Sequence, residues 1–300
     1  MPTGTRRGAR KARSGAAQTA KDSREAPGSM DEDEVTIEVE DLADFAESIN
    51  ILLYGPSGHG KTVLAGGAPN AVFVSTEKGV IAARQSGSKA KLIRTPTWER
   101  VVAAKRYCDE HYGADDWVIF DSLTKMQVLM IRWILRKIKQ DNRHRDLDIP
   151  AIQDHQKWQN YFKRFVDSLI DAPYNVIFIC TEMYKEDEEG EDIVLPAITG
   201  KGYEICNYIR AQTDVNLWYQ VTKDKHGNEV RRALAQPWGP YVAAKDRYQA
   251  LGRWWDVGFG EYEAMADMID AINQAIKNGV PNEFEEDEDQ EDEDQEDDDE

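Results

Sequence analysis

The chain has 300 residues, 41% hydrophobic and 31% charged, and a formal net charge of -19. That length suffices for one sizeable hydrophobic core with tails, or for two small domains. The three cysteines, Cys108, Cys180 and Cys206, form no C-x-x-C pair, which argues against a disulfide framework and a zinc site. No apolar run approaches the length of a membrane span, so we expect no membrane partner, no secretory signal and a cytoplasmic location.

Charge is concentrated at the two ends of the chain. From residue 283 to residue 300, fifteen of eighteen residues are acidic, and without this block the net charge of -19 falls to about -4, an ordinary value for a soluble domain. The first thirty residues carry these basic residues: Arg6, Arg7, Arg10, Lys11, Arg13, Lys21 and Arg24. Neither end shows apolar periodicity, so we predict a disordered basic arm over 1–45, a folded core over 46–280 and a disordered acidic tail over 281–300.

The middle of the chain alternates predicted strands with predicted helices. Short, nearly continuous apolar runs, typical of strands buried on both faces of a parallel sheet, occupy 49–54, 71–75, 117–121 and 175–180. Helical patterns occupy 98–112, 122–140 and 156–170. This order predicts an α/β fold, a mainly parallel sheet flanked by helices. After residue 199, the segments 213–221 and 230–236 predict an antiparallel hairpin, and 262–276 predicts a final helix.

A glycine-rich turn follows the first predicted strand. Residues 55–62 read GPSGHGKT and match the P-loop pattern G-x-x-x-x-G-K-[ST]. Glycines let successive backbone N–H groups turn inward around phosphate oxygens, and the following helix adds its positive end. We therefore predict that ATP is bound by Gly55, Pro56, Ser57, Gly58, His59, Gly60, Lys61 and Thr62. Lys61 would contact the β- and γ-phosphates.

A P-loop works with a carboxylate that helps to hold magnesium. The apolar run WVIFD ends in Asp121, on a strand that could lie beside the P-loop strand. We predict that Thr62 and Asp121 hold Mg²⁺, Asp121 acting through water. The alternative for Asp121 is a helix-capping role shared with Ser122.

Hydrolysis also needs a carboxylate that activates the attacking water. Ser122, and not a glutamate, follows Asp121, so this base must come from elsewhere. Glu77 and Glu182 each end an apolar strand, and ligands in open α/β sheets bind at the carboxyl ends of strands. We favour Glu77, one strand–helix step past the P-loop, as the catalytic base. Glu182 is then a γ-phosphate sensor or a solvated loop residue, and the reverse assignment stays open.

Six segments together carry a resemblance: LLYGPSGHGKT, FVSTEKG, VIFDSLT, VIFICTEMYK, LPAITGKG and AAKDRY. They resemble the phage-type AAA/RecA-like P-loop family, which includes core-only RecA-like single-strand annealing proteins, over about residues 48–258. The resemblance implies a RecA-like ATPase core that uses ATP and Mg²⁺, with Glu77 as base. It also implies a homo-oligomeric ring or filament in which Lys245 and Arg247 act as cations on a neighbour's γ-phosphate. An ordinary surface loop is the alternative for this pair.

The resemblance further implies DNA-stimulated ATP hydrolysis and single-stranded DNA annealing in phage recombination or replication. The segment KEDEEGEDIV, after Glu182, is acidic and repels phosphate, so DNA contacts lie elsewhere or this segment is only a hairpin tip. The better DNA-binding candidates are Arg136, Lys137, Lys139, Arg143 and Arg145. The aromatic residues Trp158, Tyr161 and Phe162 follow them, as stacking faces for bases or as core residues.

Two other functions stay open at this stage. A helicase- or packaging-type motor would require helicase motifs or a nuclease domain, and we find neither. A P-loop nucleotide switch or accessory protein with little turnover is the third possibility. The acidic tail is a solubilising segment, a competitor for the basic groove, or a contact for a single-strand-binding protein or another replication partner. The basic arm is a second candidate contact for phosphate.

Overall fold

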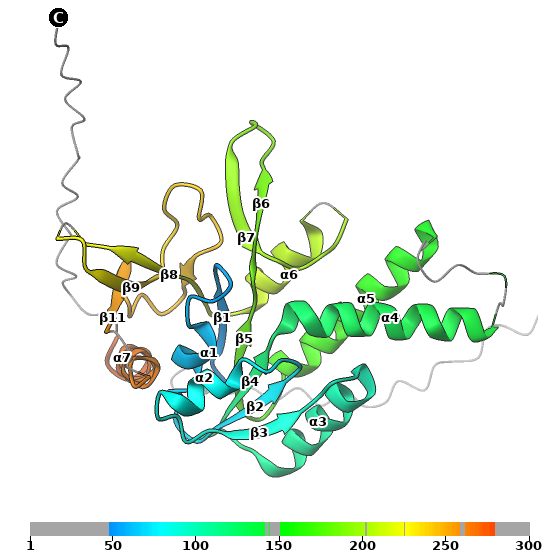
Figure 1. Cartoon of the computed structure of the whole chain (residues 1–300), viewed down its shortest axis with the longest axis horizontal. Helices are drawn as coiled ribbons and strands as arrows, with labels where there is room; N and C mark the ends of the chain where they lie inside the picture. Colours follow the sequence, from blue (N-terminus) through cyan, green and yellow to red (C-terminus); the bar gives the residue numbers. More distant parts are fainter. Residues whose placement is uncertain are drawn as a thin grey trace, which may run out of the picture. The chain divides into compact units, whose positions relative to one another are not determined.

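The computed structural model describes residues 48–141, 144, 151–201, 203–224, 226–258 and 262–279. The predicted basic arm and acidic tail lie outside these residues, as do two of the DNA-binding candidates, Arg143 and Arg145. The folded part consists of a central sheet with helices on both faces (Figure 1). The predicted α/β class is therefore confirmed.

The elements follow the predicted order closely. They are β1 (Asn50–Tyr54), α1 (Lys61–Ala65), β2 (Ala71–Ser75), α2 (Val80–Gln85), β3 (Lys91–Arg94), α3 (Trp98–His111), β4 (Trp117–Asp121), α4 (Leu123–Asp141), α5 (Ile152–Ile170), β5 (Asn175–Ile179), β6 (Glu182–Glu186), β7 (Asp192–Pro196), α6 (Glu204–Gln212), β8 (Val215–Lys223), β9 (Glu229–Leu234), β10 (Lys245–Asp246), β11 (Trp254–Val257) and α7 (Ala264–Asn278). The four predicted strands, the three predicted helices, the hairpin β8–β9 and the final helix are all present. Sequence reasoning missed α2, β3, α6, β10 and β11, which are short.

The central sheet has the strand order β11-β9-β8-β1-β5-β4-β2-β3, and β10 pairs with β8. The strands from β8 to β3 in this order run parallel, whereas β9, β10 and β11 add an antiparallel extension. One expectation was wrong: β4, which carries Asp121, does not lie beside β1. β5 lies between them, because its apolar run pairs with both strands. The carboxyl end of β5 therefore lies between the carboxyl ends of β1 and β4.

Side chains of β1 alternate between two core layers. Leu52 and Tyr54 belong to the layer formed with α3, α4, α5 and α6, whereas Ile51 and Leu53 belong to the layer formed with α1, α2 and α7. All four side chains are fully buried. Because the sheet is covered on both faces, its strands are held in register and their carboxyl ends lie at fixed positions.

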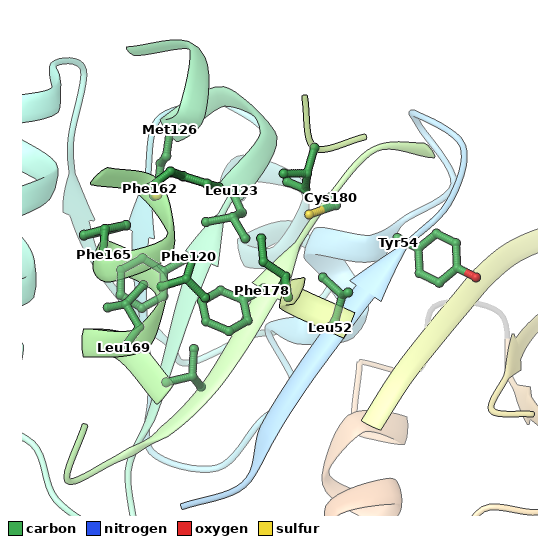
Figure 2. Packing of buried hydrophobic residues seen from close by; sticks show 14 of the residues in the cluster. Leu52, Tyr54, Phe120, Leu123, Met126, Phe162, Phe165, Leu169, Phe178 and Cys180 are labelled. Carbon is green, nitrogen blue, oxygen red and sulfur yellow. The ribbon is translucent and has the colours of Figure 1, made fainter. Parts of the chain in front are cut away.

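The aromatic residues of α5 belong to the core. Figure 2 shows Phe162 in the same layer as Phe120 of β4 and Phe178 of β5. Trp158 is also buried, and the partly buried Tyr161 packs edge-on against the ring of Trp98. The interpretation as core residues is therefore confirmed for Trp158 and Phe162, which are not available as stacking faces for bases, and Tyr161 packs at the edge of the same layer.

The acidic segment after Glu182 forms the hairpin β6–β7. Glu182 pairs with Pro196 at the base of this hairpin, and Glu186 pairs with Asp192 near its tip. The hairpin forms a two-stranded sheet separate from the central one. The expectation that this segment is a hairpin tip is thus met. Across the described ranges, no helix combines the length and apolar character that spanning a membrane requires.

Candidate functional site

The P-loop leaves β1 at Gly55, and its first residue lies against β8. Gly55 has a φ of 147°, and a β-carbon added there would lie 2.2 Å from the backbone oxygen of Tyr219. Only glycine fits both that backbone conformation and that contact. α1 begins at Lys61, as predicted, but contains five residues. Its dipole is therefore small, and the predicted phosphate binding would depend mainly on backbone N–H groups of the loop.

Lys61 is folded back onto its own loop. Its Nζ donates to the carbonyl oxygens of Gly55 at 2.8 Å and Pro56 at 2.6 Å. The side chain is buried, and burial lowers the pKa of the ammonium group, which nearby acidic groups including Glu182 and Asp121 oppose. A phosphate group offers charged acceptors that form stronger hydrogen bonds than these two carbonyls.

Thr62 and Asp121 lie side by side, although 59 residues separate them in the sequence. The Thr62 hydroxyl donates to Oδ2 of Asp121 at 3.2 Å. Asp121 is 3% exposed, and burial, helped by the nearby Glu77 carboxylate, raises its pKa to about 6. The hydroxyl of Thr62 and the charge of Lys61 act in the opposite direction. A hydroxyl and a carboxylate side by side fit Mg²⁺, which takes one or two protein oxygens together with water and phosphate.

Glu77 lies beside the end of β4. The Ser122 hydroxyl donates to Oε1 of Glu77 at 2.7 Å, and the N–H of Thr76 donates to the carbonyl of Asp121 at 2.8 Å. These contacts form because β2 and β4 are direct neighbours. The Glu77 side chain is exposed, so water reaches it. Sequence reasoning did not predict the hydrogen bond from Ser122 to Glu77, which follows from the pairing of β2 with β4.

A cavity of about 230 Å³ joins these groups. Its lining comes from the P-loop, from the ends of three parallel strands and from α2: Ser57, Gly58, Gly60, Lys61, Thr62, Val63, Glu77, Gly79, Ala82, Asp121, Ser122, Ile179, Cys180 and Thr181. The structure thus brings the predicted phosphate, magnesium and base residues to one place. Such a set of groups can bind a polyphosphate with a divalent cation and present a carboxylate to water.

Glu182 lies outside the lining of this cavity. Its carboxylate accepts hydrogen bonds from Nε1 of Trp218 at 2.9 Å and from the hydroxyl of Tyr184 at 2.7 Å. Its charge nevertheless favours the protonated form of Lys61. The geometry therefore separates the two glutamates, while the sensor role of Glu182 stays a prediction.

Lys245 and Arg247 are bonded within the chain. Nζ of Lys245 donates to the carbonyl of Arg210 at 2.7 Å and to that of Thr213, at the end of α6. Nη1 of Arg247 contacts Oδ1 of Asp214 at 2.7 Å, although the arginine side chain is 51% exposed. Both cations connect β10 and the residue after it to the segment between α6 and β8. Their predicted action on a neighbouring subunit stays a prediction.

Three of the five DNA-binding candidates lie near the end of α4. Arg136, Lys137 and Lys139 are all exposed. Nζ of Lys137 lies 5.9 Å from the ring centroid of Trp133, on the same helix. These three cations are therefore exposed to solvent, and they lie more than 70 residues after the P-loop in the sequence.

The hairpin β8–β9 contacts the P-loop, which sequence reasoning did not predict. The N–H of Val221 donates to Nδ1 of His59 at 3.1 Å, and Nη1 of Arg231 donates to the carbonyl of His59 at 3.2 Å. Arg231 follows His59 by 172 residues. No local pattern marks such a contact, which depends on the pairing of β8 with β1.

Comparison with protein families identifies one match. A family model described as an AAA domain matches residues 47–248, which is more than half of the chain. The matched range contains the P-loop, Glu77, Asp121, Lys245 and Arg247. A search of curated proteins finds no match.

Proposed function

Since the chain belongs to the AAA domain family, a family of P-loop nucleotide-binding proteins, we propose that it hydrolyses ATP and couples hydrolysis to binding and annealing of single-stranded DNA. The observation that supports hydrolysis is the convergence of Lys61, Asp121 and Glu77 on one cavity. When bound, Mg²⁺ would polarise the phosphate oxygens and neutralise their charge.

Lys61 and the pair Thr62–Asp121 would bind the substrate. Lys61 would exchange its hydrogen bonds to two loop carbonyls for hydrogen bonds to phosphate oxygens. The exchange is favourable because the carbonyls are uncharged and form weaker hydrogen bonds with the ammonium group than charged phosphate oxygens do. Thr62 and Asp121 would hold the cation through a hydroxyl and a carboxylate oxygen. The pKa of Asp121, raised to about 6 by burial, falls when a divalent cation lies beside it.

Glu77 is the proposed general base. A carboxylate held through Oε1 by the Ser122 hydroxyl can present Oε2 to a water molecule at the cavity mouth. Proton transfer to that oxygen would make the attacking water nucleophilic. Ser122 then acts as a positioning residue, since it orients Glu77 and does not itself take the proton.

The exposed cations near the end of α4 support the proposed DNA contact. Arg136, Lys137 and Lys139 present positive charge that can neutralise backbone phosphates without sequence preference. The hairpin β6–β7 is acidic by contrast and would repel the same backbone. We therefore place the DNA contact on α4.

The proposal is tested by measuring ATP hydrolysis with and without single-stranded DNA, together with annealing of complementary strands. We expect DNA to stimulate hydrolysis and ATP to speed annealing. Lys139→Glu should weaken DNA binding and flatten its salt dependence, whereas Lys277→Glu, on the exposed side of α7, is the matched charge control. Strand separation would favour a motor, and tight ATP binding without turnover would favour a nucleotide switch.

We also propose that the protein works as a homo-oligomer in which Arg247 acts on a neighbour. The half-exposed side chain of Arg247 supports this, because it can exchange Asp214 for a phosphate. Arg247→Ala should bind ATP normally and hydrolyse it poorly. Mixing it with Lys61→Ala should restore some activity, because mixed interfaces pair an intact P-loop with an intact arginine. No recovery in confirmed mixed oligomers would contradict the trans role.

A further inference from the structure

We propose that the hairpin β8–β9 positions the P-loop for phosphate binding, through Arg231 and His59. The inference rests on the proposed function in one respect, because it takes the P-loop to bind nucleotide phosphates. Figure 1 shows β8 between β9 and β1, the strand from which the P-loop emerges. The hairpin therefore reaches the P-loop at His59, which is bonded to Val221 and Arg231.

Two hydrogen bonds fix His59 to the hairpin. Its ring nitrogen Nδ1 accepts from the backbone N–H of Val221 at 3.1 Å, and its carbonyl accepts from Nη1 of Arg231 at 3.2 Å. Arg231 is itself oriented by an ion pair with Glu229 at 3.1 Å, and its side chain is 21% exposed. Both the side chain and the backbone of His59 are thus bonded to β8–β9.

The bond to the His59 carbonyl controls where the next N–H group points. In a trans peptide the C=O and N–H groups point in opposite directions. Because Arg231 holds the carbonyl of His59 toward the hairpin, the N–H of Gly60 points away from the hairpin. Gly60 lines the cavity, and P-loop N–H groups are the donors that surround the α- and β-phosphates. Arg231 therefore fixes one phosphate donor before the nucleotide arrives.

The packing around Gly60 supports this role. A β-carbon added at Gly60 would lie 2.6 Å from Nη1 of Arg231, and Gly60 has a φ of 96°. The guanidinium group thus occupies the space that a side chain would need. Lys61 bonds the carbonyls of Gly55 and Pro56 at the start of the same loop. The two cations bond different carbonyls, and the bonds of Lys61 are the ones that a phosphate displaces.

A positioning role makes a prediction that a direct contact with the γ-phosphate does not. If Arg231 acts through the loop backbone, its loss should lower the affinity for ADP and the affinity for ATP equally. The reason is that the N–H of Gly60 would bond the α- or β-phosphate, and both nucleotides carry these phosphates. If Arg231 contacts the γ-phosphate, only the affinity for ATP falls. The two nucleotides therefore distinguish the mechanisms.

The experiment measures the Kd of Mg·ADP and Mg·ATP by calorimetry, with kcat and KM for ATP, on the full chain. Arg231→Ala should raise both Kd values and KM about tenfold and leave kcat within about twofold, since it removes a charge-assisted hydrogen bond. Arg231→Gln and Arg231→Lys should each restore part of the affinity, because both side chains still carry a donor for the His59 carbonyl.

Arg232→Ala is the matched control. Arg232 is the next residue on β9 and bonds Asp256 at 2.6 Å on β11, so its side chain lies on the other face of the strand. This variant loses the same charge from the same hairpin and should keep both Kd values unchanged. His59→Ala removes the contact with Val221 but keeps the carbonyl that Arg231 bonds, so it should raise both Kd values less than Arg231→Ala does.

Each outcome supports or overturns the inference. Unchanged Kd values in Arg231→Ala, with binding abolished in Lys61→Ala, would overturn it and leave nucleotide binding intact. A loss for ATP alone would replace positioning by a direct γ-phosphate contact. No binding by the unaltered chain would instead overturn the proposed function. Thermal unfolding checks that each variant folds. If Arg231→Ala does not fold, the comparison of Arg231→Gln with the unaltered chain tests the inference in its place.

Discussion

Glu77 and Glu182 have the same local sequence context and different surroundings. Each follows a threonine just after a buried parallel strand. Glu77 lines the cavity and is bonded by Ser122, whereas Glu182 is bonded by Trp218 and Tyr184 and does not line it. β2 ends beside β4 and therefore beside Asp121, while the chain after β5 continues into the hairpin β6–β7. The neighbouring strand, and not the local motif, distinguishes the candidate base.

Of the two glutamates, Glu77 should give the larger effect, measured on Glu77→Gln. Glutamine keeps the shape and still accepts a hydrogen bond from Ser122, but it cannot take a proton. We expect kcat to fall by about 10²–10⁴ while the Kd of ATP changes little. Single-turnover hydrolysis and calorimetry measure the two quantities. If Glu182→Gln produced this result and Glu77→Gln did not, the two assignments would be reversed.

Asp121→Asn should stabilise the protein without ligand while abolishing magnesium-dependent hydrolysis. The pKa of Asp121 is raised from 3.8 to about 6 by burial and by Glu77. The unfolded chain therefore ionises Asp121 at lower pH than the folded protein does, so this carboxylate lowers stability as pH rises from about 4 to about 6.

The expected gain in the free energy of unfolding is about 3 kcal/mol at pH 7. It should shrink as pH falls from about 6 and vanish below about pH 3, where Asp121 is protonated in both the folded and the unfolded state. Urea unfolding at a series of pH values measures it. A gain that stayed the same across this pH series would contradict the ionisation of Asp121 as its cause.

Ser122→Ala should have the next largest effect. It removes the hydroxyl that orients Glu77 through a 2.7 Å bond, so we expect kcat to fall about tenfold with KM for ATP unchanged. Tyr184→Phe is the matched control, because it removes the corresponding 2.7 Å donor from Glu182 on an exposed side chain. Steady-state kinetics on both variants would show whether hydroxyl support matters only at Glu77.

Local patterns in the sequence were sufficient to predict the P-loop, the buried strands and Asp121. Each of these features is defined within a few residues: the spacing of Gly55, Gly60 and Lys61, or an apolar run that ends in a carboxylate. The edge strand β3 has no such run, because most of its side chains are exposed. Its existence depends on pairing with β2.

The remaining features depend on which strands become neighbours. The position of β5 between β1 and β4, the bond from Ser122 to Glu77 and the contact of Arg231 with His59 all join segments distant in the sequence. A single sequence contains no signal for these pairings, since each strand is apolar and compatible with several orders. The choice between Glu77 and Glu182 could accordingly be stated from the sequence only as a preference.

Glu182→Gln should have the smallest effect, with kcat within about threefold of the unaltered chain. Glu182 does not line the cavity, but its charge favours the protonated form of Lys61, whose pKa burial lowers. Removing that charge lowers the pKa of Lys61 further. ATP binding requires the ammonium form, so kcat/KM should begin to fall at a lower pH on the alkaline side than in the unaltered chain. The pH profile of kcat/KM measures this shift. A hundredfold loss of kcat at neutral pH would instead identify Glu182 as the general base. Its hydrogen bonds from Trp218 and Tyr184 would then be the contacts that position this base.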